Sequence, residues 1–285
     1  MAIFNSLAEL KNSVSLLDKA EEREVLISKK GEDFKTDRYK AIWNIDRNHL
    51  STIASRKYKT IQHSEVFNSV IDALLDLGIT CEGNLKQYHE GDVATLELIF
   101  RNGDYRVRDD SEDGIAIGIK VTNGFNLWTA VTFQLFAYRS VCQNGMWLGK
   151  AIRGVGIKRN HIGELNLPQI ARQFIKSVAD NNKVVQKLID DCLKDTTEWK
   201  IAKLLFERMI KTEKYRELLL GELKKLGKEK LTRYDLYNLL TRLCSDEKLS
   251  IRESAENYLQ TKAQEVLTQP IEILVRKYKK QEDKI

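Results

Sequence analysis

The sequence predicts an α+β protein, in which an antiparallel β-meander sheet with a packed helix is followed by a C-terminal helical region. Between residues 79 and 160, short apolar runs alternate with polar residues at the period of two that is typical of half-buried strands. After Pro168 the apolar residues recur at three- and four-residue spacing, which is the period of an α-helix. We therefore expect an N-terminal helical or irregular segment at 1–38, an α+β core domain at 39–165 and a C-terminal helical region at 166–285.

The composition is that of a protein with a sizeable core. The chain has 285 residues, of which 42% are hydrophobic. No apolar run approaches the roughly 18 residues of a membrane span, and the N-terminus lacks the basic and apolar regions of a signal peptide. The four cysteines are far apart and form no CxxC pair, which fits reduced thiols. These features predict a cytoplasmic protein without a membrane partner.

The N-terminal part predicts helices and short strands. Apolar residues between 3 and 23 recur as on one helical face, and a polar turn is expected at 29–37. Ser64 is the expected N-cap of a helix that runs to Leu77, and Gly78 then takes the position where a residue without Cβ strain is preferred. Strands are expected at 39–45 and 58–62.

The middle of the chain predicts a meander, because closely spaced strands with short turns favour antiparallel neighbours over crossover connections. Its most aromatic window, 125–148, contains an alternating stretch from Val131 to Leu135. That window also contains Asn144-Gly145, a pair that favours a tight turn. The expected strands are Thr80–Tyr88, Ala94–Arg101, Ile115–Thr122, Trp128–Cys142 and Ala151–Lys158.

The region after Pro168 predicts helices throughout. Apolar stripes at helical spacing occur between 170 and 226, and two capping-box patterns mark further helix starts. These patterns are Thr232 with Asp235 and Ser250 with Glu253.

Sequence motifs of common enzymes are absent. The chain has no Walker A loop and no GxGxxG, HExxH or GxSxG motif, and its four histidines are dispersed. Cys142 beside Asn144 could act as a nucleophile with a histidine supplied by the fold, or it could be a small buried residue at the end of a strand. Whether Cys142 and Asn144 are architectural or functional stays open. We assign no catalytic residue, no metal ligand and no cofactor.

Charge is distributed unevenly along the chain. Residues 151–285 contain 28 Lys and Arg against 20 Asp and Glu, a net charge of +8, whereas the whole chain carries +6. A basic half can indicate a polyanionic partner, although mixed Lys and Glu on helices usually form a solvated face.

Basic and aromatic residues alternate around the end of the aromatic window. Cations follow phosphates while aromatic rings stack on bases, so this pattern suits single-stranded nucleic acid. The alternative is that the aromatic residues belong to the core and the cations to a solvated rim. The candidate nucleic-acid-binding residues are Arg139, Lys150, Arg153, Lys158 and Arg159, with Tyr138 and Trp147 as stacking residues.

Three segments carry a resemblance to a known family. They are Tyr58–His63 leading into a helix, Arg139–Gly145 with its Arg-x-x-Cys-x-Asn-Gly core, and Tyr237–Thr241. The chain resembles an uncharacterised family of phage- and plasmid-borne proteins, although Leu239 stands where that family often has alanine. The resemblance implies a product of a mobile genetic element that acts in the host cytoplasm. The order of elements is also similar, at the level of fold alone, to single-strand-annealing recombinases.

Three functions follow as hypotheses. The first is a non-enzymatic protein that binds or anneals single-stranded DNA in the replication or recombination of a virus or plasmid, and that forms homo-oligomers. The second is a structural or protein-interaction component of a mobile genetic element that does not bind nucleic acid. The third is a cysteine- or metal-dependent enzyme.

Overall fold

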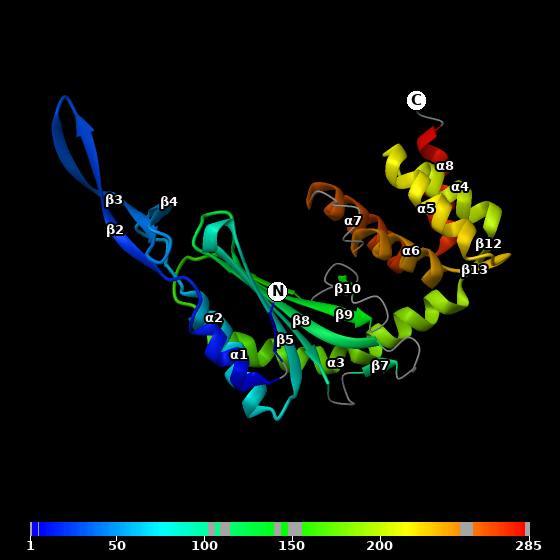
Figure 1. Cartoon of the computed structure of the whole chain (residues 1–285), viewed down its shortest axis with the longest axis horizontal. Coiled ribbons are helices and arrows are strands. Elements are labelled where there is room, and N and C mark those ends of the chain that lie inside the picture. The colour runs from blue at the N-terminus through cyan, green and yellow to red at the C-terminus, as the bar shows by residue number, and fades with distance from the viewer. Residues whose placement is uncertain are drawn as a thin grey trace. The chain divides into compact units, whose positions relative to one another are not determined.

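The computed structural model confirms the α+β fold, with antiparallel sheets and a C-terminal helical region (Figure 1). It describes residues 2–4, 6–101, 106–108, 115–139, 144–147, 156–245 and 253–282. The chain divides into two compact units. Unit 1 comprises Met1–Arg106, Ala116–Phe136 and Gly154–Asn181, and unit 2 comprises Val107–Ile115, Ala137–Arg153 and Asn182–Ile285.

The larger sheet contains the predicted meander. Its strand order is β1-β5-β6-β8-β9-β10, with β11 paired to β9 and β7 paired to β8. The strands are β1 (Ala2–Phe4), β5 (Cys81–Tyr88), β6 (Val93–Phe100), β7 (Arg106–Arg108), β8 (Ile115–Gly124), β9 (Val131–Arg139), β10 (Asn144–Trp147) and β11 (Gly156–Arg159). The prediction that Asn144-Gly145 turns the chain is wrong, because both residues lie in β10, which pairs with β9.

One face of this sheet is buried under helices α1 (Leu7–Val14), α2 (His63–Asp76) and α3 (Leu167–Lys194). Gly83 of β5 lets Leu10 of α1 approach closely, since a Cβ there would lie 3.0 Å from the leucine Cδ2. On the same face, the rings of Phe133 in β9 and Phe174 in α3 are 5.6 Å apart. The predicted packed helix is therefore confirmed, but its N-cap is Gln62 rather than Ser64.

The second sheet has the order β2-β3-β4 and corrects the prediction for the N-terminal part. Its strands are β2 (Ala20–Lys29), β3 (Glu32–Asn44) and β4 (His49–Ser55). The helix predicted over 3–23 is limited to α1, and the polar turn predicted at 29–37 is the end of a β-hairpin. Most of β2 is exposed on both faces, so its sequence lacks the alternation that marks a half-buried strand. The strand predicted at 58–62 is also wrong, because that segment makes one isolated bridge, Tyr58 with Ile162.

The C-terminal region is helical, as predicted, and also has a short two-stranded sheet that the sequence does not signal. The Thr232 capping box is confirmed, since the Asp235 N–H donates to Thr232 Oγ1 at 3.0 Å and the Thr232 N–H donates to the Asp235 carboxylate at 2.8 Å. Ser250 lies outside the described residues. The elements after α3 are β12 (Thr196–Glu198), α4 (Trp199–Met209), α5 (Glu213–Lys225), β13 (Lys230–Thr232), α6 (Arg233–Ser245), α7 (Glu253–Thr268) and α8 (Ile271–Glu282). Among the described helices, none combines the length and the apolar character needed to cross a bilayer.

Candidate nucleic-acid interface

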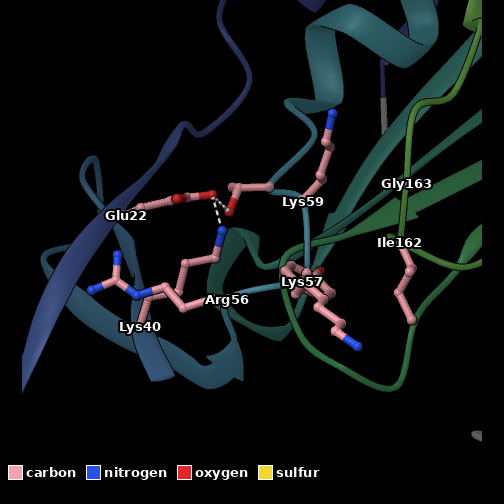
Figure 2. Close-up of a pocket in the computed structure, with 9 residues that line it drawn as sticks. Glu22, Lys40, Arg56, Lys57, Lys59, Ile162 and Gly163 are labelled. Atoms are coloured by element: carbon pink, nitrogen blue, oxygen red, sulfur yellow. Dashed lines mark hydrogen bonds and ion pairs between the residues drawn. The ribbon is translucent and has the colours of Figure 1, made fainter. Parts of the chain in front are cut away.

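Unit 1 contains an open pocket of about 580 Å³ beside the second sheet (Figure 2). Strand β2 borders it on one side and the segment with Ile162 and Gly163 borders it on the other, with residues 56–60 between them. We call residues 56–60 the connector, because they join β4 to the start of α2. The pocket is lined by Glu22, Lys40, Arg56, Lys57, Tyr58, Lys59, Thr60, Ile162 and Gly163.

Two histidine contacts hold the connector against the segment that follows β11. The Lys59 N–H donates to the His161 carbonyl at 2.7 Å, and His161 Nδ1 lies 3.1 Å from the Lys59 carbonyl. A carbonyl only accepts, so this contact assigns the proton to Nδ1. The imidazole also stacks on the Tyr58 ring at 5.0 Å. Burial lowers the pKa of His161 despite the bond to Lys59, so the ring is a neutral structural contact near neutral pH.

The pocket carries an excess of positive charge at its rim. Lys40 is buried, and its ammonium is neutralised by Glu22 at 2.5 Å. Burial opposes ionisation of Glu22, but hydrogen bonds from Lys40 and Thr60 outweigh it and lower the pKa of this carboxyl. Three exposed cations remain at the rim, namely Arg56, Lys57 and Lys59.

Acidic residues near the rim offset these cations only in part. Lys59 Nζ is 4.0 Å from Glu164, whose side chain is 96% exposed, and exposed pairs of this kind contribute little. The positive charge of Arg56 also helps to lower the pKa of Glu24, after the larger effect of Lys35. Figure 2 shows Lys57 and Lys59 extending in different directions from the connector, so the positive charge is spread along it.

An exposed tryptophan lies on a loop that contacts the connector. Trp128 is 91% exposed. The Asn126 side-chain oxygen accepts the N–H groups of Trp128 and Thr129 at 3.1 and 2.8 Å, which fixes the turn. The Tyr58 hydroxyl in turn lies 3.3 Å from the carbonyls of Gly124 and Asn126. Tyr58 therefore contacts both the pocket and the loop that presents the indole ring.

A buried histidine fixes the end of the connector at the start of α2. The His63 Nε2–H donates to the Gly91 carbonyl at 3.0 Å, while Nδ1 accepts from the Asn123 amide at 3.0 Å. Asn123 also donates to the Ile61 carbonyl at 3.0 Å, and the His63 ring stacks on Phe125 at 4.0 Å. Burial lowers the pKa of His63 to about 4. The ring is therefore a neutral structural element.

Two buried aspartates, Asp92 and Asp18, bond side chains of the second sheet and its β3–β4 turn, and Asp92 connects β4 to the start of β6 in the larger sheet. Asp92 Oδ1 accepts from Ser51 Oγ at 2.5 Å and lies 3.1 Å from His49 Nε2. Asp18 accepts from Arg47 Nε at 2.8 Å. Ser51 and His49 both bond to Asp92, so the serine is not paired with a histidine base as a nucleophile requires. We assign this cluster a structural role.

Two of the described cysteines, Cys81 and Cys192, are buried and do not favour thiol chemistry. Burial raises the pKa of Cys81 to about 12 and that of Cys192 to about 11, so both are protonated near neutral pH. Cys142 lies outside the described residues. Within the part of the chain that the structure describes, no group of three or more His, Cys, Asp or Glu side chains is placed to hold a metal ion.

The sequence-predicted binding residues fall into three groups. Lys158 and Arg159 are exposed on β11, opposite Thr132 and Val131 of β9, and the chain runs from them into the pocket segment. Tyr138 and Arg139 lie at the other end of β9, and Trp147 lies in β10; these three belong to unit 2. Lys150 and Arg153 lie outside the described residues. Two of the seven therefore lie on the strand that leads into the pocket segment, although they do not line the pocket, and the role of all seven stays a prediction.

Sequence reasoning missed the connector and Trp128 as candidate site residues. The Arg-Lys-Tyr-Lys run at 56–59 was a usable signal, because three cations flank one aromatic residue. The sequence pattern predicts Trp128 at the start of a strand, whereas it lies in the loop between β8 and β9.

The fold and this pocket define an α+β protein with a basic surface site. The chain belongs to the family described as Domain of unknown function (DUF932), which it matches over residues 50–265. The matched region includes the connector, Trp128 and β11. No curated protein and no solved structure matches the chain.

Proposed function

We propose that this protein binds single-stranded DNA without enzymatic activity, through the connector, β11 and Trp128. The observation that carries the proposal is the contact of Tyr58 with both the cationic pocket and the loop that presents the exposed indole. Sites for single-stranded nucleic acid combine these two features, because cations follow the phosphates and a flat aromatic face stacks on a base.

The geometry supports a role for the connector and Arg159 in holding phosphates. Arg56, Lys57 and Lys59 lie within four residues, and hydrogen bonds to His161 fix the connector near the chain that leaves β11. Arg159 is paired with Val131, whose side chain lies on the helix-covered face, whereas Lys158 is paired with Thr132 on the opposite face. Arg159 also lies two residues before His161, which bonds the connector, and we therefore expect Arg159 to act with the connector and Lys158 to contribute more weakly.

The first experiment measures binding of a fluorescent oligothymidine by anisotropy across a salt series. We expect Lys57→Gln, Lys59→Gln and Arg159→Gln each to weaken binding about equally for all sequences, and to reduce the salt slope by about 0.7 for each phosphate that is no longer neutralised. Lys200→Gln, at an exposed lysine of α4, is the matched control and should bind as the wild type does. Full-strength binding by the triple variant, which combines Lys57→Gln, Lys59→Gln and Arg159→Gln, or no binding by the wild type at low salt, would contradict the proposal.

The second experiment separates stacking from charge. Trp128→Ala should weaken binding by about 1–3 kcal/mol if one base stacks on the indole. The salt slope should stay unchanged, because an uncharged indole neutralises no phosphate and so releases no counterion. Trp128→Phe should recover part of the affinity, and Leu16→Ala, at another exposed apolar position, should have no effect. If Trp128→Ala changes the salt slope of binding, the substitution has altered the phosphate contacts of the neighbouring cations, and the stacking interpretation is wrong.

The resemblance to phage- and plasmid-borne proteins supports a role in the replication or recombination of a mobile genetic element, in the host cytoplasm. The similarity of element order to single-strand-annealing recombinases makes annealing the first activity to test. A protein that anneals must hold two strands at once, so we expect several copies to act together. Annealing of two complementary labelled strands should be faster with the protein than without it, and the triple cation variant should lose that effect.

A second function, as a protein-interaction component, is favoured by a different observation. The end of the β2–β3 hairpin exposes the cross-strand pair Ile27 and Phe34 on one face and Leu26 on the other, and exposed apolar side chains that cluster in this way mark interaction surfaces. If the oligonucleotide experiments fail, this function becomes the leading one.

A further inference from the structure

The end of the β2–β3 hairpin is a separate two-stranded structure. We call residues 26–35 the distal hairpin; it pairs Leu26 with Lys35 and Ile27 with Phe34. Its turn is formed by Lys30 and Gly31, with φ of 55° and 84°, the positive values of a two-residue hairpin turn. Towards the base of the hairpin the strand register shifts, because the pair that follows Leu26 with Lys35 is Glu24 with Lys40. Strand β4 pairs with β3 only from Tyr39 onward, so the distal hairpin extends beyond it (Figure 1).

The distal hairpin exposes apolar side chains on both faces. Ile27 and Phe34 share one face as a cross-strand pair and are 52% and 51% exposed. Leu26, on the other face, is 58% exposed. An isolated two-stranded hairpin is marginally stable in water, and it gains stability from further strands with an apolar face or from packing against a helix. An edge strand with exposed apolar residues also favours pairing with another strand.

We propose that the distal hairpin pairs with the same hairpin of a second copy of this chain, through the outer edge of β3. Two antiparallel β3 strands related by a twofold axis perpendicular to the sheet would meet at Phe34. The two copies of Phe34 then lie opposite each other, with Ile27 of each copy outside them. The result is a four-stranded sheet with an apolar row of Ile27, Phe34, Phe34 and Ile27 across one face.

The charges of β3 favour a second copy as the partner and favour this register. With Phe34 at the axis, Asp33 lies opposite Lys35 of the second copy, and the same pair occurs twice by symmetry. If the twofold axis passed through Asp33, Asp33 of one copy would lie opposite Asp33 of the other. If it passed through Lys35, the two copies of Lys35 would lie opposite each other. Opposite charges across a strand pair stabilise it, and like charges destabilise it. The neighbouring pair, Glu32 with Thr36, is compatible with the same register.

The charge balance of the distal hairpin distinguishes it from the basic pocket. Its residues include Lys29, Lys30 and Lys35 against Glu32 and Asp33, so it lacks a marked excess of either sign. Lys35 also forms an ion pair with Glu24 of its own chain, but both side chains are more than half exposed and the pair is weak. A surface that is apolar and nearly neutral suits a protein partner better than a polyanion. The proposal does not depend on DNA binding.

The experiment is sedimentation velocity of the full chain over a concentration series, without nucleic acid. We expect a monomer–dimer equilibrium whose dissociation constant rises at least tenfold in Phe34→Asp. Asp33→Lys and Lys35→Asp should each weaken the dimer, because each places like charges opposite each other twice. The double exchange, Asp33→Lys with Lys35→Asp, restores unlike pairs and should dimerise more tightly than either single variant.

Leu16→Asp is the matched control, because Leu16 is an 82% exposed apolar residue outside the hairpin, and it should leave the equilibrium unchanged. Circular dichroism shows whether each variant is folded. Three results would each overturn the proposal: a wild type that is monomeric at all concentrations, a dimer that Phe34→Asp does not weaken, or a double exchange no tighter than the single variants.

Discussion

Gly91 lies in the short turn between β5 and β6, close to the buried Asp18. A side chain there would overlap the Asp18 carboxylate, and its φ of 89° lies in the region that favours glycine. His89 and Glu90 also have positive φ, of 51° and 54°. Such values cost about 1–3 kcal/mol each in residues other than glycine. The bond from Asn44 to the Glu90 carbonyl and the bond from His63 to the Gly91 carbonyl help to hold this turn.

Gly91→Ala should introduce both backbone strain and an overlap with Asp18. It should therefore destabilise the protein more than a glycine substitution that introduces backbone strain alone. Gly163→Ala is the matched control, because Gly163 has a φ of 78° and no atom near the added Cβ. We expect Gly163→Ala to lower the free energy of unfolding by about 1 kcal/mol and Gly91→Ala by at least about 2 kcal/mol more. Urea denaturation of both variants measures the difference. Equal losses would mean that Asp18 moves aside without cost.

Strands buried on one face were predictable from the sequence, and exposed strands were not. β6, β8 and β9 place alternate apolar residues under the helices, so the period of two appears in the sequence. Apart from its buried base around Ala20 and Ile42, the hairpin of β2 and β3 is exposed and carries charged residues on both faces. The Lys30-Gly31 turn was its one local signal, because both residues adopt positive φ.

The start of α2 makes the stability of the protein depend on pH. The pKa of His63 is about 4 in the folded chain and about 6.5 in an unfolded one. Between these values the unfolded chain binds a proton that the folded chain does not bind. The free energy of unfolding should therefore fall as the pH drops from about 6.5 towards 4, by up to about 3 kcal/mol from this group. His161, whose pKa is also lowered, contributes in the same direction.

His63→Gln should remove this part of the pH dependence. Urea denaturation from pH 7 to pH 4.5 should give a smaller loss of stability in the variant than in the wild type, whatever their difference at pH 7. His89→Asn, at an exposed histidine with positive φ, is the control and should keep the wild-type slope. An unchanged slope in His63→Gln would contradict the assignment of a neutral, buried ring.

The candidate site was only partly predictable, because the fold assembles it from distant segments. Lys158 and Arg159 were predictable from a local run of cations. The contact that places them near the connector, Lys59 with His161, joins residues 102 positions apart. The hydrophobic period of the sequence predicts neither the turn at Asn126 nor the exposure of Trp128. Both depend on β8 ending at Gly124, and the periodic pattern does not mark that end.

At the scale of the whole chain, the two units are interleaved in sequence. Unit 1 takes segments from all three of the parts that the sequence predicted, and the boundary predicted at 165 falls within it. Helix α3 begins in unit 1 and continues into unit 2, and its Phe174 packs on Phe133 of the larger sheet. A fragment that ends at 165 would therefore expose the apolar surface that the first half of α3 covers.

Limited proteolysis tests this organisation directly. We expect the fragment 1–165 to be degraded rapidly and to bind a hydrophobic dye, because Phe133 and its neighbours lose their cover. The fragment 1–181, which retains Phe174, should be more resistant than 1–165 under the same conditions. Equal resistance of the two fragments would show that α3 is not needed for the core of unit 1.

The double contact of Tyr58 has a consequence for how this family varies. Its ring stacks on His161 and its hydroxyl reaches the carbonyls of Gly124 and Asn126, so three segments depend on one side chain. A family member with phenylalanine in place of Tyr58 would keep the ring stacking on His161 but would lose the hydroxyl contacts with Gly124 and Asn126. We expect the residues at positions 58, 126 and 161 to be inherited as a set, and an exposed aromatic residue at 128 to be found where that set is complete.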